Sequence, residues 1–65
     1  MWMVVYMAQN KSTADKIKDL LSREGFLVKL KPVYKRVSSK DNYYEILVPQ
    51  SEASEVHDIL MEQGF

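Results

Sequence analysis

The side chain best suited to acid–base or metal chemistry occurs once in this chain, as His57, and the chain has no cysteine. An imidazole titrates near neutral pH and binds metals, but a zinc site needs further His or Cys ligands at defined spacing. The sequence offers His57 no such partners, and the residue falls beside the apolar stripe of a predicted helix. We therefore predict that His57 has no catalytic or metal-binding role.

Carboxylates and hydroxyls offer weaker possibilities. Four acids recur at helical spacing near the end of the chain: Glu52, Glu55, Asp58 and Glu62. They could hold a hard cation loosely, but the spacing of a calcium loop is absent, so a solvated helix face is the simpler interpretation. Ser12 and Ser51 have no base at a defined spacing that would make either a nucleophile. The sequence thus predicts no catalytic residue, no metal site and no cofactor.

Charge is distributed unevenly along the chain, although the net charge is zero. Residues 1–40 hold all nine Lys and Arg against three acids, a net charge of +6, and residues 41–65 hold six acids and no base, a net charge of −6. The positive residues cluster in a predicted basic patch: Lys29, Lys31, Lys35 and Arg36, with Lys40 close by. Each charged segment can be a solvated face, or the two can meet within one chain or between two copies.

The elements that position these residues follow from an internal repeat. Residues 12–26 (STADKIKDLLSREGF) and 51–65 (SEASEVHDILMEQGF) share one pattern at an offset of 39 positions. Each copy predicts a helix that a serine, Ser12 or Ser51, caps at its start and that a glycine, Gly25 or Gly64, ends. Both copies carry an apolar stripe at helical spacing: Ala14, Ile17, Leu20 and Leu21 in the first, and Ala53, Val56, Ile59 and Leu60 in the second.

Three strands are predicted around these helices. Residues 3–8 are β-branched, aromatic and apolar on both faces, which indicates a strand covered on more than one side. A second strand begins at Phe26 and reaches Pro32, which cannot donate to a ladder and indicates an edge or a bulge, with residues 34–37 continuing the strand beyond it. Residues 38–42 form a polar turn, and residues 43–48 alternate as the third strand.

The order strand, helix, strand, strand, helix predicts an α+β fold in one domain over residues 1–65. It is a ferredoxin-like βαββα two-layer sandwich lacking the fourth strand. A right-handed crossover places both helices on one side of an antiparallel sheet with strand order 1-3-2. The first strand then has an unpaired apolar edge, so we expect a homodimer in which two first strands pair, or coverage of the edge by a partner protein.

The sheet face opposite the helices is the second place where a partner could bind. One alternating set of the first strand should lie there: either Trp2, Val4 and Tyr6, or Met3, Val5 and Met7. Together with residues of the other strands, the first of these sets gives the predicted interface: Trp2, Val4, Tyr6, Leu27, Tyr43 and Leu47. An exposed apolar sheet face is typical of a protein interface.

Nucleic-acid binding is the alternative function. It would use the basic patch and two tyrosines: Lys29, Lys31, Lys35 and Arg36 with Tyr34 and Tyr43. Aromatic residues on an open sheet beside cations are typical of modules that stack RNA bases. The glycine and aromatic pattern of those modules is absent, however, and the net charge is zero. We therefore expect nucleic acid to be a less suitable partner than protein.

Length and composition favour a small intracellular protein. A chain of 65 residues buries only about 60% of the surface that it exposes when unfolded, so a second copy or a partner would stabilise it. The absence of cysteine fits a reducing compartment. The longest apolar run, residues 2–8, is too short for a membrane span and lacks the features of a signal peptide. We therefore expect a soluble cytoplasmic protein.

Several segments carry a resemblance to a known family. WMVVYMAQN, a helix with a DLL core and an EGF stop, FLVKLKPV and YEILVPQSEASEVHDIL together cover nearly the whole chain. The chain resembles small bacterial proteins described as signal-transducing domains of unknown function. Some short Firmicute-type chains of this kind are labelled glutamate decarboxylase, but 65 residues cannot enclose pyridoxal phosphate together with a substrate. The resemblance implies a binding or regulatory module.

Overall fold

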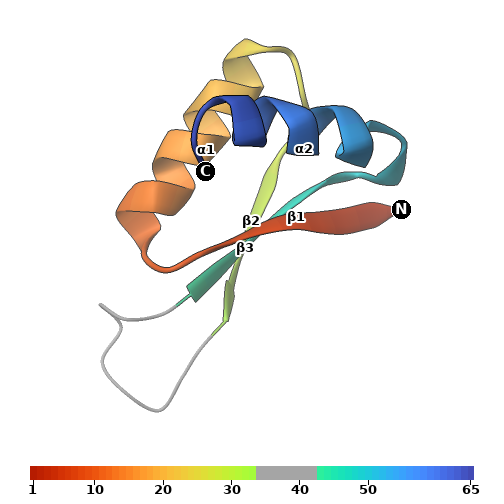
Figure 1. Ribbon diagram of the computed structural model, residues 1–65. Coiled ribbons are helices and arrows are strands. Elements are labelled where there is room, and N and C mark those ends of the chain that lie inside the picture. The colour runs from red at the N-terminus through yellow and green to blue at the C-terminus, as the bar shows by residue number, and fades with distance from the viewer. Residues whose placement is uncertain (34–42) are drawn as a thin grey trace.

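A computed structural model describes residues 1–33 and 43–65 of the chain (Figure 1). The elements follow the order strand, helix, strand, strand, helix, with a short 3₁₀ turn before the second helix. Their bounds are β1 Trp2–Ala8, α1 Lys11–Arg23, β2 Lys29–Val33, β3 Tyr43–Pro49, η2 Gln50–Glu52 and α2 Ala53–Glu62. The predicted continuation of the second strand over residues 34–37 and the predicted turn over residues 38–42 lie outside the described residues.

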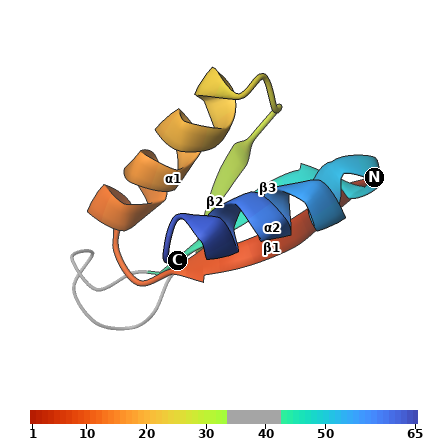
Figure 2. The same ribbon diagram turned by 45° about the horizontal axis from the view of Figure 1, so that its top comes forward.

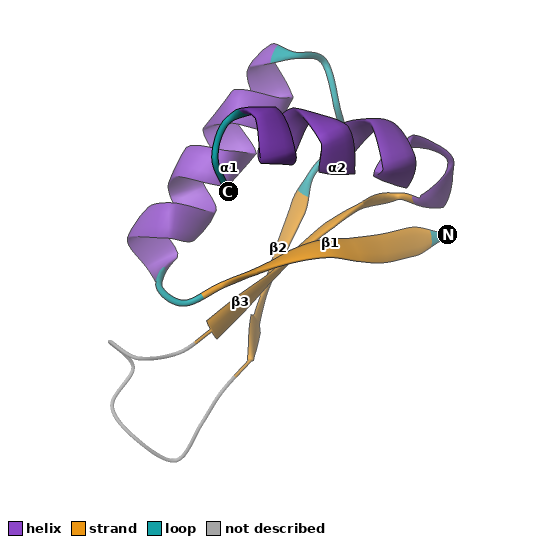
Figure 3. Ribbon diagram, in the orientation of Figure 1, coloured by secondary structure: helices purple, strands orange, loops and turns teal. Residues whose placement is uncertain are grey.

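The predicted topology is confirmed. β3 pairs antiparallel with both other strands, so the described sheet has the order β1-β3-β2. Both helices cover the same side of this sheet, and the other side carries no helix in any view (Figures 1 and 3). Turning the molecule shows α2 lying along β1 (Figure 2), and the contacts place α1 mainly against β3. The result is a two-layer α+β sandwich of the ferredoxin-like type with three strands.

The core lies between the helices and the sheet, where the predicted stripes meet β1 and β3. Its buried members are Ala8 of β1; Ala14, Ile17 and Leu21 of α1; Ile46 and Val48 of β3; and Ala53, Val56 and Leu60 of α2. Leu20 and Ile59, the remaining stripe residues, are half-buried and pack against this core. Burying a large aliphatic side chain contributes roughly 1.5–3 kcal/mol to stability. Most of the buried core residues belong to the two copies of the repeat, so the repeat supplies most of the apolar burial between helices and sheet.

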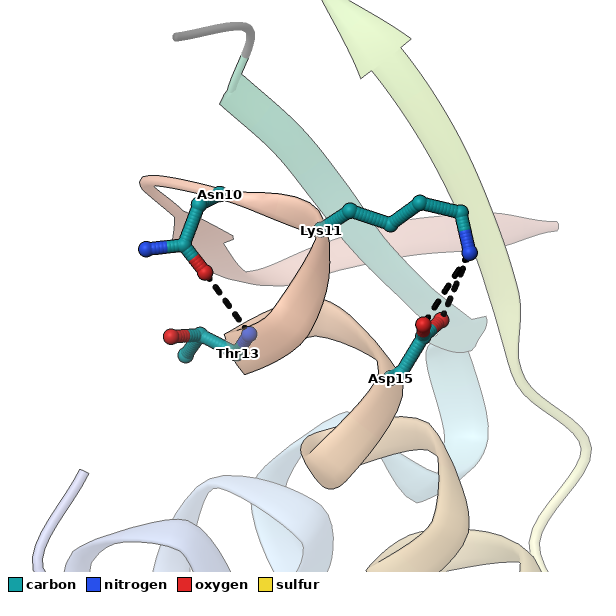
Figure 4. A network of polar contacts seen from close by, with 4 residues as sticks. All are labelled: Asn10, Lys11, Thr13 and Asp15. Carbon is teal, nitrogen blue, oxygen red and sulfur yellow. Dashed lines mark hydrogen bonds and ion pairs between the residues drawn. The ribbon is translucent and has the colours of Figure 1, made fainter. Parts of the chain in front are cut away.

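The start of α1 differs from the prediction. The helix begins at Lys11, and the cap is Asn10, whose side-chain oxygen accepts a hydrogen bond of 2.8 Å from the backbone N–H of Thr13 (Figure 4). Ser12 therefore lies inside the first turn of α1, and the prediction that Ser12 caps this helix was wrong. Asn and Ser are about equally good caps, so the choice depends on where β1 delivers the chain.

The start of α2 also differs. Pro49 is followed by the 3₁₀ turn Gln50–Glu52, and α2 begins at Ala53 without a side-chain cap. Ser51 lies in that turn, so its predicted capping role was wrong as well. A 3₁₀ turn supplies bonds from each N–H to the carbonyl three residues earlier, and here the Ala53 N–H donates to the Gln50 carbonyl.

The helix ends match each other and the prediction. Gly25 and Gly64 have φ angles of +93° and +89°, the left-handed region that favours glycine. The next residue in each copy, Phe26 or Phe65, donates its N–H to the carbonyl five residues earlier, at 3.1 and 2.9 Å. This bond defines a Schellman ending. Two copies of the motif therefore stop their helices identically.

The strand boundaries show two further differences. β2 begins at Lys29, three residues later than the predicted start at Phe26, and Pro32 lies within it on the sheet edge that the prediction required. β1 contains a bulge, because its register with β3 shifts between Val4 and Tyr6. Within the described residues, neither helix has the length and apolar character of a bilayer-spanning segment.

Candidate interaction surface

The register of the strands decides which side chains lie on the face away from the helices, here called the open face. Ile46 and Val48 of β3 are buried beneath the helices, so Glu45 and Leu47, which alternate with them, belong to the open face. Residues directly opposite each other on antiparallel strands share a face. The open face therefore carries Trp2, Val4 and Met7 of β1, Tyr43, Glu45, Leu47 and Pro49 of β3, and Lys29, Lys31 and Val33 of β2.

The bulge divides β1 between the two faces. Val4 lies opposite Leu47 on the open face, but Tyr6 lies opposite Ile46, on the side of the helices. The Tyr6 ring meets the Phe65 ring edge to face, with centroids 6.0 Å apart and planes at 79°. Neither of the two alternating sets predicted for β1 lies intact on the open face, because the extra residue at the bulge reverses the alternation after Val5.

The predicted interface residues are thus placed differently from one another. Trp2, Val4, Tyr43 and Leu47 share the open face. Tyr6 packs on the helix side against the core. Leu27 is 68% exposed in the segment that precedes β2, outside the sheet. Met7 joins the open face in place of Tyr6, and no sequence signal could have shown this, because β1 is apolar at every position.

One contact on the open face joins residues of the two edge strands, β1 and β2, across β3. The Lys29 ammonium nitrogen lies 4.4 Å from the centroid of the Trp2 ring, a cation–π geometry. Lys29 is opposite Leu47, and Trp2 is opposite Pro49, so the pair reaches diagonally over β3. The lysine therefore covers one side of the indole on the open face.

The two edges of the sheet have opposite character. The β2 edge carries Lys29, Lys31 and Pro32, the residue types that block the addition of another strand. The β1 edge, Trp2–Ala8, has no charged residue and no proline. It does carry large apolar side chains that are 38–45% exposed: Trp2, Met3, Val4 and Met7. Only β1 therefore offers an edge without protection among the described strands.

The β1 edge continues into the helix layer. Phe65 is 38% exposed and packs on Tyr6 of β1, and Met61 in the last turn of α2 is 62% exposed. Met3 lies opposite Val48, on the side of the helices, and is 45% exposed. We call these residues together the β1 surface: Trp2, Met3, Val4 and Met7 with Phe65. It holds most of the exposed large apolar side chains of the described residues.

Lys31 lies opposite one acid, Glu45, on the open face, but the acids of α2 lie on the other layer. Lys29 and Lys31 are on the open face, whereas Glu55, Asp58 and Glu62 are exposed on the side of α2 that is turned away from Val56 and Leu60. Within one chain these lysines and the acids of α2 are therefore separated by the sheet and the core. The other two residues of the predicted basic patch, Lys35 and Arg36, lie outside the described residues.

Residues considered for chemistry are dispersed. His57 is exposed on α2, and across residues 1–33 and 43–65 no three His, Asp or Glu side chains gather closely enough to hold a metal ion. An exposed ion pair lies at the start of α1, where the Lys11 ammonium donates to Asp15 at 3.0 Å (Figure 4). That hydrogen bond, and then the charge of Asp15, raises the pKa of Lys11.

The class of the chain is set by its fold, an α+β βαββα sandwich with a three-stranded sheet in the order 1-3-2. Comparisons with models of protein families, with curated proteins and with solved structures each found no significant match. The function is therefore inferred from the geometry of the open face and the β1 surface.

Proposed function

We propose that this chain is a non-enzymatic interaction or regulatory module that works as a homodimer. The observation that carries the proposal is the contrast between the two sheet edges. β2 has lysines and a proline, which discourage strand addition, and β1 has exposed apolar side chains and no such residue. An unprotected edge of this kind favours association with another chain.

A regulatory role in the bacterial cytoplasm is the form of this function that the sequence supports. The support is the resemblance to small bacterial signal-transducing domains, together with a surface suited to binding. Flat apolar surfaces of this kind bind other proteins more often than small molecules, which prefer concave sites.

The size of the chain is compatible with a dimer. Its accessible surface is 4686 Å², and a standard interface uses about 800 Å² from each partner. About one sixth of the surface would therefore be buried on association.

Sedimentation equilibrium over protein concentrations from about 1 μM to 1 mM tests the proposal, because self-association depends on concentration. We expect a species of twice the 7.6 kDa chain mass, with the monomer recovered on dilution. A monomer that persists at the highest concentration contradicts the proposed homodimer.

Binding of single-stranded nucleic acid is the second candidate, and one observation favours it. The register brings Trp2, Tyr43, Lys29 and Lys31 to the same open face, as stacking on a sheet requires. Against it, Lys29 already covers one side of the Trp2 ring, so a base stacking there would have to displace the lysine.

Trp2 is the only tryptophan, so its fluorescence reports directly on this second candidate. Titration with an oligothymidylate should quench Trp2 emission, and the affinity should fall steeply between about 50 and 200 mM salt, because phosphate contacts release counterions. Unchanged emission at the lower salt concentration would exclude stacking on Trp2.

A further inference from the structure

We infer that two copies of the chain join through β1, edge to edge and antiparallel, so that their three-stranded sheets form one continuous six-stranded sheet. The inference rests on the proposed homodimer and specifies its interface. The alternative for a dimer is to stack the two open faces on each other, which would bury Leu47 and leave the β1 edge vacant.

Symmetry makes β1 the edge suited to a second copy. In a two-fold antiparallel pair each residue meets residues of the same strand. Pairing β2 with β2 would therefore bring Lys29 and Lys31 near the same two lysines of the second copy. Like charges directly opposite each other are destabilising. β1 has no charged residue from Trp2 to Ala8, so its self-pairing meets no such repulsion.

Burial points to the first half of β1. The bulge at Val5 interrupts the strand, and bulges terminate or redirect pairing. Beyond it, Met7 is 44% exposed, but Tyr6 is half-buried and Ala8 is fully buried. Before it, Trp2, Met3 and Val4 are all 38–45% exposed, so only this part of β1 is exposed at consecutive positions. Pairing over residues 2–4 places the two-fold axis near Met3.

Both faces of the sheet contribute apolar area at this axis. Trp2 and Val4 lie on the open face, whereas Met3 lies on the helix side, where Phe65 at the end of the α2 segment is 38% exposed. A β1–β1 pair places Met3 against its copy on the helix side, and Trp2 against Val4 of the second copy on the open face. Backbone hydrogen bonds and apolar burial on two faces then act together, as in other strand-addition interfaces.

The acids of α2 do not oppose this arrangement. Glu55, Asp58 and Glu62 are exposed on α2 and do not belong to its buried stripe, which includes Val56 and Leu60. They remain in solvent when β1 pairs. The backbones of Lys29 and Lys31 lie on β2, two strands away from the new ladder. Of these two lysines, only Lys29 reaches the interface, where its ammonium covers one side of the Trp2 ring.

Charge placement provides the first test. Met3→Lys and Leu27→Lys each convert an exposed apolar residue to lysine, but only Met3 lies on the β1 edge. We expect Met3→Lys to weaken dimerisation at least tenfold in sedimentation equilibrium, because two ammonium groups meet near the axis, and Leu27→Lys to leave it unchanged. Circular dichroism of both variants establishes that the fold is retained.

Disulfide crosslinking provides the second test, which traps the dimer and does not require that it be weakened. The chain has no cysteine, so a single introduced cysteine can form only an intermolecular disulfide, and that bond requires Cβ atoms about 3.5–4.5 Å apart. Under mild oxidation Met3→Cys should give a covalent dimer rapidly, and the controls Leu27→Cys and Lys31→Cys should remain monomeric on a non-reducing gel.

The two proposals fail differently. A wild-type chain that stays monomeric at every concentration overturns the homodimer and the β1 pairing together. A wild-type dimer that Met3→Lys leaves intact and Leu47→Lys dissociates overturns the β1 pairing alone, because Leu47 lies at the centre of the open face. Dissociation by Met3→Lys with a rapid Met3→Cys crosslink supports both.

Discussion

The ammonium group of Lys29 lies 4.4 Å from the centre of the Trp2 ring, although β2 and β1 are the two opposite edges of the sheet. The long lysine side chain and the wide indole together span β3, where Leu47 lies between them in register. A single contact therefore links the protected edge to the unprotected one, and it keeps a positive charge on an otherwise apolar part of the open face.

Removal of that charge should have a measurable cost. Lys29→Met keeps the aliphatic stem but loses the cation, so we expect the free energy of unfolding to fall by about 0.5–1 kcal/mol, the usual value at an exposed site. Urea denaturation at one fixed protein concentration, followed by Trp2 fluorescence, measures this. Lys29→Arg retains the cation and serves as the control; equal stabilities of the wild type and Lys29→Met would show that the contact contributes nothing.

The cap of α1 can be assigned by mutation. Asn10→Ala removes the acceptor of the Thr13 N–H and should destabilise the protein by about 0.5–2 kcal/mol. Ser12→Ala, inside the first turn, should change stability by less than about 0.5 kcal/mol. Thermal denaturation of the two variants compares them directly. A larger loss for Ser12→Ala would return the cap to the position that the repeat predicted.

Substitution of Gly25 or Gly64 should destabilise the protein through backbone conformation and not through side-chain clashes. A Cβ at Gly25 or Gly64 would meet no atom within 4 Å, so the cost of Gly25→Ala or Gly64→Ala comes from the positive φ angle, about 1–2 kcal/mol. Asn tolerates this conformation better, so Gly25→Asn should lose less than Gly25→Ala. Equal losses for the two substitutions, measured by urea denaturation, would indicate another cause.

The pair at the start of α1 predicts a pH dependence of known sign. The hydrogen bond to Asp15, and then its charge, raises the pKa of Lys11 above 10.5. The contribution to stability is therefore complete below about pH 10.5 and is lost as the pH rises through the higher folded-state pKa. Both side chains are largely exposed, so salt should reduce the effect.

Urea midpoints of the wild type and Lys11→Gln test this over the same pH range. The difference between them should be small and constant from about pH 7 to 9. It should shrink as the pH rises through the raised folded-state pKa of Lys11 and vanish once Lys11 is neutral in both states. A difference that grows with rising pH would have the wrong sign for this pair.

Sequence periodicity was sufficient for the helices and their endings. The stripe residues Ile17 and Leu21 of α1 and Val56 and Leu60 of α2 are buried as predicted, because an apolar face at helical spacing must find an apolar partner. Gly25 and Gly64 end both helices as predicted, since few other residues adopt a positive φ at low cost. These features depend on interactions within a few residues of one another.

The caps were less predictable for a physical reason. Asn10 and Ser12 both bear side chains that can accept from an N–H in the first turn, so local chemistry alone does not choose between them. The choice depends on the direction in which β1 leaves the sheet after Ala8. At α2, Pro49 and the 3₁₀ turn Gln50–Glu52 take the place of a side-chain cap, so two similar sequences begin their helices differently.

By itself the sequence determined the order of the elements, the strand order of the sheet and the helix residues that form the core, because helical periodicity, glycine stops and crossover handedness are local or general constraints. Only the tertiary structure decided which side chains of β1 face away from the helices. Every position of β1 is apolar, so alternation carried no information there, and pairing with β3 introduced the bulge that places Tyr6 with Phe65 and leaves Trp2, Val4 and Met7 on the open face.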